Sequence, residues 1–216
     1  MKDLSPWRSL SSAIVSDMLD QVGRKAQLFD RAIRPILDKP LLVGRARTLQ
    51  FGPGTAEGDR DDMLEAYFGF LDSLQEGDVP VIACGLPNRY GIWGDVLSTA
   101  AQMRGAEGCV TDGFARDILQ IKEMGFSLYC SSAGPQDPGG RAKIVAADVA
   151  VSCGGTWVEP GDLIFGDFDG CLAVPQDVEE ITLSMGQAAL AKDEETLALV
   201  RSGKLLREVY KVTGVF

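Results

Sequence analysis

Two short segments of the sequence combine charged side chains with turn residues in a way that could support chemistry. In the first, Gly94 and Asp95 precede an apolar stripe that predicts a helix. The first N–H groups of a helix lack intrahelical partners, so the amides of Val96 and Leu97 could hold a carboxylate or another anion. A structural role for Asp95 is the alternative, because Asp is a favoured N-cap residue, worth about 1 kcal/mol.

The second segment, Thr111 to Asp117, runs from an expected strand through the turn Asp112-Gly113 to the adjacent pair Arg116-Asp117. The guanidinium of Arg presents a planar fork to an oxyanion, and Asp can hold Mg²⁺ directly or through water. The alternative is an ordinary surface pair of opposite charge beside an ordinary turn.

Histidine is absent from the 216 residues of the chain. Its absence excludes Ser-His-Asp and Cys-His nucleophile pairs and removes the commonest transition-metal ligand. A reaction would therefore use carboxylates, Lys, Arg, Tyr, Cys or a hard metal ion. The five cysteines are far apart and form no CxxC pair, which predicts buried thiols in a reducing compartment.

The formal net charge of −10 and a pI near 4.5, without a Lys/Arg cluster, argue against nucleic acid as a partner. No apolar run reaches about 18 residues and no secretory signal follows Met1, so we expect a cytoplasmic protein without a membrane partner. With 45% hydrophobic residues, the length suits one core, and a single domain over residues 1–216 is expected.

Hydrophobic periodicity and turn residues predict a layered α/β fold with a mixed sheet. Helices alternate with strands in the first half of the chain, strands cluster in the second half, and a long helix ends the chain. The expected helices cover residues 9–22, 59–74, 96–103, 116–124, 175–202 and 205–210. The expected strands cover residues 41–51, 79–84, 109–111, 126–131, 144–152, 156–158, 163–165 and 171–174, and residues 85–94 are expected to form a loop.

The spacing between the two charged segments matches a known sequence pattern. Twenty residues separate Asp95 from Arg116, and Asp117 follows directly, which is the D-x20-R-D pattern. Four sequence blocks, at residues 91–95, 104–113, 158–162 and 166–170, occur in the same order as in one known family. On these residues the chain, over roughly residues 10–203, resembles the class II pyruvate aldolase/RraA-like family.

This resemblance implies a swivelling β/β/α-type domain that forms a homotrimer or hexamer, with the active site between neighbouring subunits. Asp117 would anchor Mg²⁺, Mn²⁺ or another divalent metal largely through water, and Arg116 would hold the keto or enolate oxygen. The amides of Gly94, Asp95, Val96 and Leu97 would receive the pyruvyl carboxylate. Asp95 would position a proton-transferring water beside the metal.

The implied activity is metal-dependent retro-aldol cleavage of a 4-hydroxy-2-oxo acid or diacid to release pyruvate, with oxaloacetate decarboxylation through the same enolate. Glu194 or Glu195 of an adjacent subunit would participate, unless both lie on a solvated helix face. The family also includes protein-binding inhibitors of an RNA-degrading endonuclease, which is the alternative function. Asp95 favours the enzyme, because the binding role has no use for this carboxylate. The identity of the substrate is left open. The outer wall of its pocket is expected from loop 52–59 and from a neighbouring subunit, and the surroundings of Arg89, Tyr90 and Trp93 are expected to select the leaving group.

Overall fold

The computed structural model describes residues 3–54, 59–85 and 90–215. A mixed sheet of eight strands forms its centre. These strands are β1 (Arg34–Pro35), β2 (Leu42–Pro53), β3 (Asp78–Ala83), β5 (Gly108–Thr111), β7 (Ser127–Cys130), β9 (Ala142–Ala147), β12 (Leu163–Gly166) and β13 (Cys171–Val174). The strand order is β1-β7-β5-β3-β2-β12-β13, and β9 also pairs with β2.

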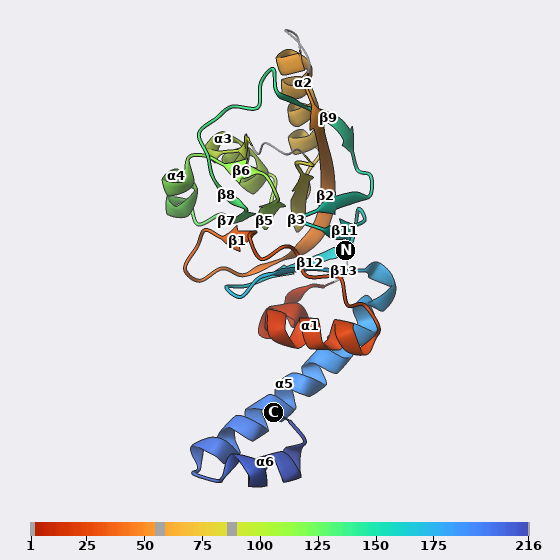
Figure 1. Cartoon of the computed structure of the whole chain (residues 1–216), viewed down its shortest axis with the longest axis vertical. Helices are drawn as coiled ribbons and strands as arrows, with labels where there is room; N and C mark the ends of the chain where they lie inside the picture. Colours follow the sequence, from red (N-terminus) through yellow and green to blue (C-terminus); the bar gives the residue numbers. More distant parts are fainter. Residues whose placement is uncertain (1–2, 55–58, 86–89, 216) are drawn as a thin grey trace.

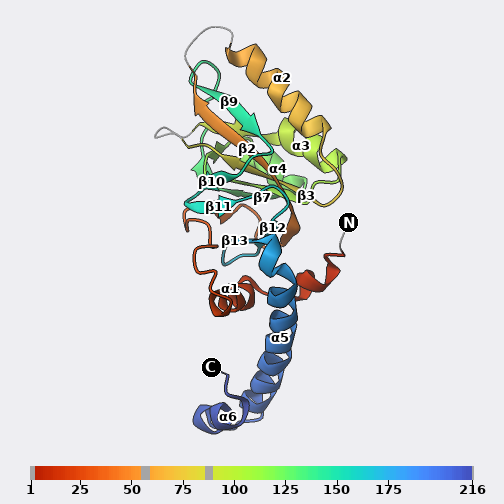
Figure 2. The same cartoon turned by 90° about the vertical axis from the view of Figure 1, so that its right-hand side faces the viewer.

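The parallel part of the sheet is buried on both faces, as parallel strands usually are. Strands β2, β3, β5 and β7 run parallel to one another. Helices α2 (Asp59–Asp72), α3 (Asp95–Met103) and α4 (Ile118–Glu123) pack their buried side chains on one face. The antiparallel hairpin of β10 (Val151–Cys153) and β11 (Thr156–Val158) covers the other face. Figures 1 and 2 show the resulting β/β/α layers.

The N-terminal helices and the first part of the long C-terminal helix pack on the antiparallel strands β12 and β13. A 3₁₀ helix, η1 (Ser5–Ser9), leads into α1 (Ser12–Gln21), and a second one, η2 (Gln176–Val178), leads into α5 (Glu179–Arg201). The carboxylate of Asp167 accepts hydrogen bonds from the Ser12 amide at 2.7 Å and hydroxyl at 2.6 Å, which holds the start of α1 on the sheet. Helix α5 extends away from the layers, and α6 (Leu206–Thr213) folds back along it (Figures 1 and 2).

A second, small sheet contains the strands that precede the charged segments. It consists of β4 (Gly91–Trp93), β6 (Phe114–Ala115) and β8 (Ser132–Ala133), paired in parallel. These strands are two or three residues long, and their sequence carries no alternation that would predict them. The expected loop over residues 85–94 therefore contains a strand.

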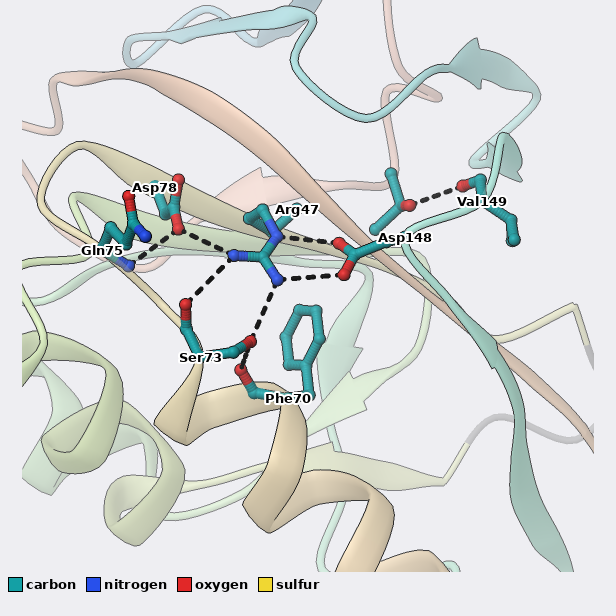
Figure 3. A network of polar contacts seen from close by, with 8 residues as sticks. Arg47, Phe70, Ser73, Gln75, Asp78, Asp148 and Val149 are labelled. Carbon is teal, nitrogen blue, oxygen red and sulfur yellow. Dashed lines mark hydrogen bonds and ion pairs between the residues drawn. The ribbon is translucent and has the colours of Figure 1, made fainter. Parts of the chain in front are cut away.

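Arg47, in the middle of β2, joins three neighbouring elements (Figure 3). Its Nε and Nη2 donate to the Asp148 carboxylate at 2.8 and 3.0 Å, and its Nη1 donates to Asp78 at 3.2 Å. Nη2 also donates to the Ser73 hydroxyl at 3.0 Å, and the guanidinium lies 5.8 Å from the ring centroid of Phe70. Arg47 thereby fastens the C-terminal end of α2 to the sheet.

The expected layered fold, with its mixed sheet and long C-terminal helix, is confirmed. The single strand expected over residues 144–152 is wrong, because Asp148 adopts a positive φ of 53° and separates β9 from β10. The C-terminal helix begins at Glu179 and not at Pro175, which is extended. The five cysteines are free and buried, as expected. Within the described ranges, no helix is long and apolar enough to cross a membrane.

Candidate functional site

The charged segments of the sequence lie in two neighbouring strand-to-helix connections, β4 to α3 and β6 to α4. Strand β4 leads through Gly94 into α3, and the adjacent strand β6 leads through Arg116 and Asp117 into α4. The carboxyl ends of neighbouring parallel strands share one edge of a sheet, where α/β proteins build their sites. The Arg116 amide donates to the Trp93 carbonyl at 2.9 Å, which fixes one connection against the other.

Gly94 lies directly beneath the two charged side chains. A Cβ atom added at Gly94 would be 2.8 Å from Oδ2 of Asp117 and 3.3 Å from Cγ of Arg116. Nε of Arg116 is itself 3.5 Å from Oδ2 of Asp117, and both side chains are partly exposed to solvent. Only a residue without a side chain therefore leaves room for this arrangement.

We expect Gly94→Ala to lower the kcat of any reaction at this site by about tenfold to 100-fold, since small displacements of catalytic groups have effects of that size. The backbone at Gly94 is extended, with φ of −156°, so alanine fits the main chain and the effect is local. Steady-state kinetics together with thermal unfolding would measure it.

Gly69→Ala is the matched control, because Gly69 lies in α2 with open space around its Cβ position. This change should raise the free energy of unfolding by about 0.5–1 kcal/mol and leave kcat unchanged. Unchanged kinetics in Gly94→Ala would show that Arg116 and Asp117 do not need their observed positions.

Asp117 occupies an uncommon backbone conformation for a residue other than glycine. It is the N-cap of α4 with φ of 58°, and its side chain makes no capping hydrogen bond. Its carbonyl accepts the Ile121 amide at 3.1 Å, so the backbone alone starts the helix. Such strained residues cluster at functional sites, and here the carboxylate lies over Gly94 beside Arg116.

Asp95 is the first residue of α3, and Gly94 is the N-cap. The structural alternative for Asp95, a conventional N-cap, is therefore wrong. One carboxylate oxygen of Asp95 accepts the Val96 amide at 2.7 Å, while the Ser98 amide donates to the Gly94 carbonyl at 3.0 Å. A bound carboxylate could use the Leu97 amide directly, but it would have to displace Asp95 from the Val96 amide.

These residues line a cavity of about 230 Å³. Gly94 to Leu97 form one side, Arg116 and Asp117 a second, and α2 a third, with Met63, Leu64, Tyr67 and Phe68. A neighbouring cavity of about 470 Å³, bordered by Ala133 to Pro135, also reaches Arg116 and Asp117. Arg116 and Asp117 therefore border both cavities.

Asp137 also belongs to this site, although no motif in the sequence points to it. Its Oδ2 is 3.4 Å from Nη1 of Arg116, and its Oδ1 accepts the Gly139 amide at 2.7 Å. Asp137 lies in the Pro- and Gly-rich segment before β9, where the usual interpretation is a loop. Arg116 is consequently flanked by two carboxylates, those of Asp117 and Asp137.

The wall contributed by α2 was likewise not expected. Tyr67 is buried, and its hydroxyl donates to the Ile92 carbonyl, so α2 is held against β4. Burial raises the pKa of Tyr67 well above its usual value, which keeps the phenol neutral at ordinary pH. Phe68, one position further round the helix, leaves 51% of its surface exposed and borders the cavity.

Three earlier expectations concern further residues. Trp93 lines the cavity, but its side chain is buried and its indole N–H donates to the Ser98 hydroxyl at 2.8 Å, so the ring contributes to packing. That its surroundings select a leaving group stays a prediction. Arg89 and residues 55–58 lie outside the described residues. Glu194 and Glu195 are exposed and belong to the second half of α5. Helix α5 extends away from α2 and α3 in both views (Figures 1 and 2). Their role across a subunit boundary stays a prediction.

The oxygen donors at the cavity fit a hydrated hard cation. Among the described residues, no group of three or more Cys, Asp or Glu side chains is arranged to enclose a metal ion. Mg²⁺ typically keeps several waters and uses only one or two carboxylates together with substrate oxygens. Asp117, with Asp95 on the facing connection, offers such a donor set.

The chain is similar to known proteins of one family. The model of the RraA-like family, described as Aldolase/RraA, matches residues 12–173. A protein of Halalkalibacterium halodurans named "Putative 4-hydroxy-4-methyl-2-oxoglutarate aldolase" is 32% identical over 193 residues, which cover 88% of this chain and 85% of that protein.

Two solved structures share the fold over most of both chains. An uncharacterized protein from Pseudomonas syringae superposes with a TM-score of 0.84 at 26% identity, covering 95% of each chain. RraAS2 of Streptomyces coelicolor, described as an unusual member of the RNase ES inhibitor RraA protein family, has a TM-score of 0.79 at 27% identity and covers 89% of this chain and 94% of its own.

Proposed function

Because the chain belongs to the RraA-like (Aldolase/RraA) family, we propose that it is a divalent-metal-dependent lyase that cleaves a 4-hydroxy-2-oxo acid by a retro-aldol reaction and releases pyruvate. The observation that carries the proposal is the convergence of Asp95, Arg116 and Asp117 on one cavity around Gly94. The name of the Halalkalibacterium relative supports the same class of reaction.

The residues of the cavity suit the charges that this reaction develops. The Leu97 amide at the start of α3 would bind the substrate carboxylate, supported by the helix dipole. Arg116 would stabilise the negative charge that grows on the keto oxygen as the C3–C4 bond breaks. A bound Mg²⁺ or Mn²⁺, held by Asp117 through water, would supply further stabilisation of that oxygen.

A proton must also leave the C4 hydroxyl as the bond breaks and a C4 carbonyl forms. Asp95 would hold the water that accepts this proton, since its carboxylate lies at the cavity and the chain has no histidine for the task. Protonation of C3 then completes pyruvate. Oxaloacetate would lose CO₂ by breaking its C3–C4 bond to the same enolate, so decarboxylation is proposed as a second activity.

The test is pyruvate release from 4-hydroxy-2-oxo acids with and without a second carboxylate, and from oxaloacetate, in the presence of Mg²⁺ or EDTA. We expect turnover that requires the metal and returns when Mg²⁺ is added in excess of EDTA. A folded protein that releases no pyruvate from any of these substrates would overturn the proposal.

The second candidate function is binding to an RNA-degrading endonuclease, supported by the likeness to RraAS2. It would appear as inhibition of an RNase E-type enzyme by the purified chain, unaffected by Arg116→Ala. For either function we propose a homotrimer or hexamer, with Glu194 or Glu195 reaching a neighbouring subunit's cavity. Light scattering would determine the number of subunits.

A further inference from the structure

The cavity beside Arg116 has one charged side and one apolar side, and the difference between them bears on the substrate. Its described charged residues are three carboxylates and one guanidinium, those of Asp95, Asp117, Asp137 and Arg116. Arg116 is already within 3.5 Å of two of these carboxylates. One substrate carboxylate and a divalent metal can be accommodated in such a site, but a second substrate carboxylate finds no further cation among the described lining residues.

The opposite wall is built to meet an apolar group. Leu64 and Phe68 are four residues apart on α2 and so share one side of the helix, next to the buried stripe that contains Met63 and Tyr67. The Tyr67 hydroxyl donates a hydrogen bond to the Ile92 carbonyl, which fixes the rotation of α2 about its own axis. The side of the helix that carries Leu64 and Phe68 therefore faces the cavity.

Two apolar side chains remain largely exposed there. Phe68 is 51% exposed, and Val96, across the cavity at the start of α3, is 75% exposed. Covering them with an apolar group removes hydrocarbon from water, whereas placing a carboxylate between them leaves a charge poorly solvated.

We propose that the preferred substrate is a 4-hydroxy-2-oxo monocarboxylic acid with an apolar substituent at C4, seated against Phe68, and not a dicarboxylic acid. This inference rests on the proposed lyase function and narrows it. The C3–C4 bond would break, the C4 hydroxyl would lose its proton, and the products would be pyruvate and an apolar ketone or aldehyde.

A matched pair of substrates tests the preference. In 4-hydroxy-4,5-dimethyl-2-oxohexanoate an isopropyl group replaces the second carboxylate of 4-hydroxy-4-methyl-2-oxoglutarate, at nearly equal size. We expect kcat/KM, counted per C3–C4 bond broken, to favour the monocarboxylate by about tenfold or more, the range typical of apolar pockets. A preference for the dicarboxylate would overturn the inference and leave the lyase function standing.

Binding provides a readout that does not depend on turnover. Calorimetric titration with Mg²⁺ present should show 5-methyl-2-oxohexanoate binding about tenfold more tightly than its dicarboxylate counterpart, 2-oxoglutarate. If no substrate is cleaved but this ratio holds, the lyase proposal fails and the ligand class survives. Equal binding of the two acids contradicts the inference directly.

Phe68→Lys locates the preference on α2. Because Phe68 is half exposed, lysine can be accommodated, and its charge should reduce the ratio about tenfold or reverse it. Met103→Lys is the matched control, since Met103 is 80% exposed at the other end of α3 and is not among the cavity residues. A ratio that moves equally in both variants, or in neither, would remove Phe68 from the selection of substrate.

Discussion

Replacing Arg116 by alanine is expected to lower kcat/KM for pyruvate release by about 10²–10³-fold, the usual effect of removing a donor aimed at developing negative charge. The backbone amide of Arg116 donates a hydrogen bond to the Trp93 carbonyl, which holds the residue in place. Its guanidinium is the one cation among the described residues that line the smaller cavity. Arg116→Lys should recover only part of the activity, because an ammonium group lacks the planar fork.

Arg104→Ala provides the control for Arg116→Ala. Arg104 pairs with Asp72 at 2.9 Å on the exposed surface, outside the cavity, so its loss should leave kcat/KM within about twofold of the wild type. Steady-state kinetics of the variants, with circular dichroism to verify folding, would measure the difference. Equal losses in the two variants would mean that net charge, and not the position of Arg116, governs the rate.

Replacing Asp117 by asparagine is expected to weaken Mg²⁺ or Mn²⁺ binding by about 100-fold and to reduce metal-dependent turnover in parallel. Asparagine tolerates the positive φ of 58° at this position better than most residues, so the backbone should be retained. The change therefore removes the charge of the ligand while keeping its shape.

Calorimetric titration with Mn²⁺ would measure this loss without any turnover. Asp72→Asn is the matched carboxylate control, because Asp72 belongs to an exposed ion pair away from the cavity and should not affect metal affinity. Undiminished Mn²⁺ affinity in Asp117→Asn would assign the metal to other ligands.

Much of the architecture follows from periodicity in the sequence. The apolar stripes predicted the main helices, and the β-branched runs predicted the longer strands, because burial of one face imposes a repeat. The three-stranded sheet of β4, β6 and β8 escaped prediction, since strands of two or three residues are too short to show such a repeat. The strand predicted over residues 144–152 is interrupted at Asp148, which has a positive φ. This interruption could not be predicted, because Asp148 is held by hydrogen bonds to Arg47, a residue far away in the sequence.

The site was predictable only where its residues adjoin helix starts. Gly94-Asp95 and Arg116-Asp117 each lie at the start of a helix, and the structure places both at one cavity. Asp137 could not be recognised, because its proximity to Arg116 arises from the path of a long connection. Phe68 resembles any other apolar residue of an amphipathic helix, and only its exposure in the folded chain separates it from the core.

The placement of α2 affects how a protein of this kind can evolve. Helix α2 lies between β2 and β3 in the sequence, apart from the two connections that hold Asp95, Arg116 and Asp117. Its last turn is anchored through Ser73 and Phe70 to Arg47, so the exposed side that carries Phe68 can vary without disturbing that anchor. Mutation and selection can therefore change which compounds are accepted while the groups that we propose break the bond, encoded elsewhere in the chain, are inherited intact.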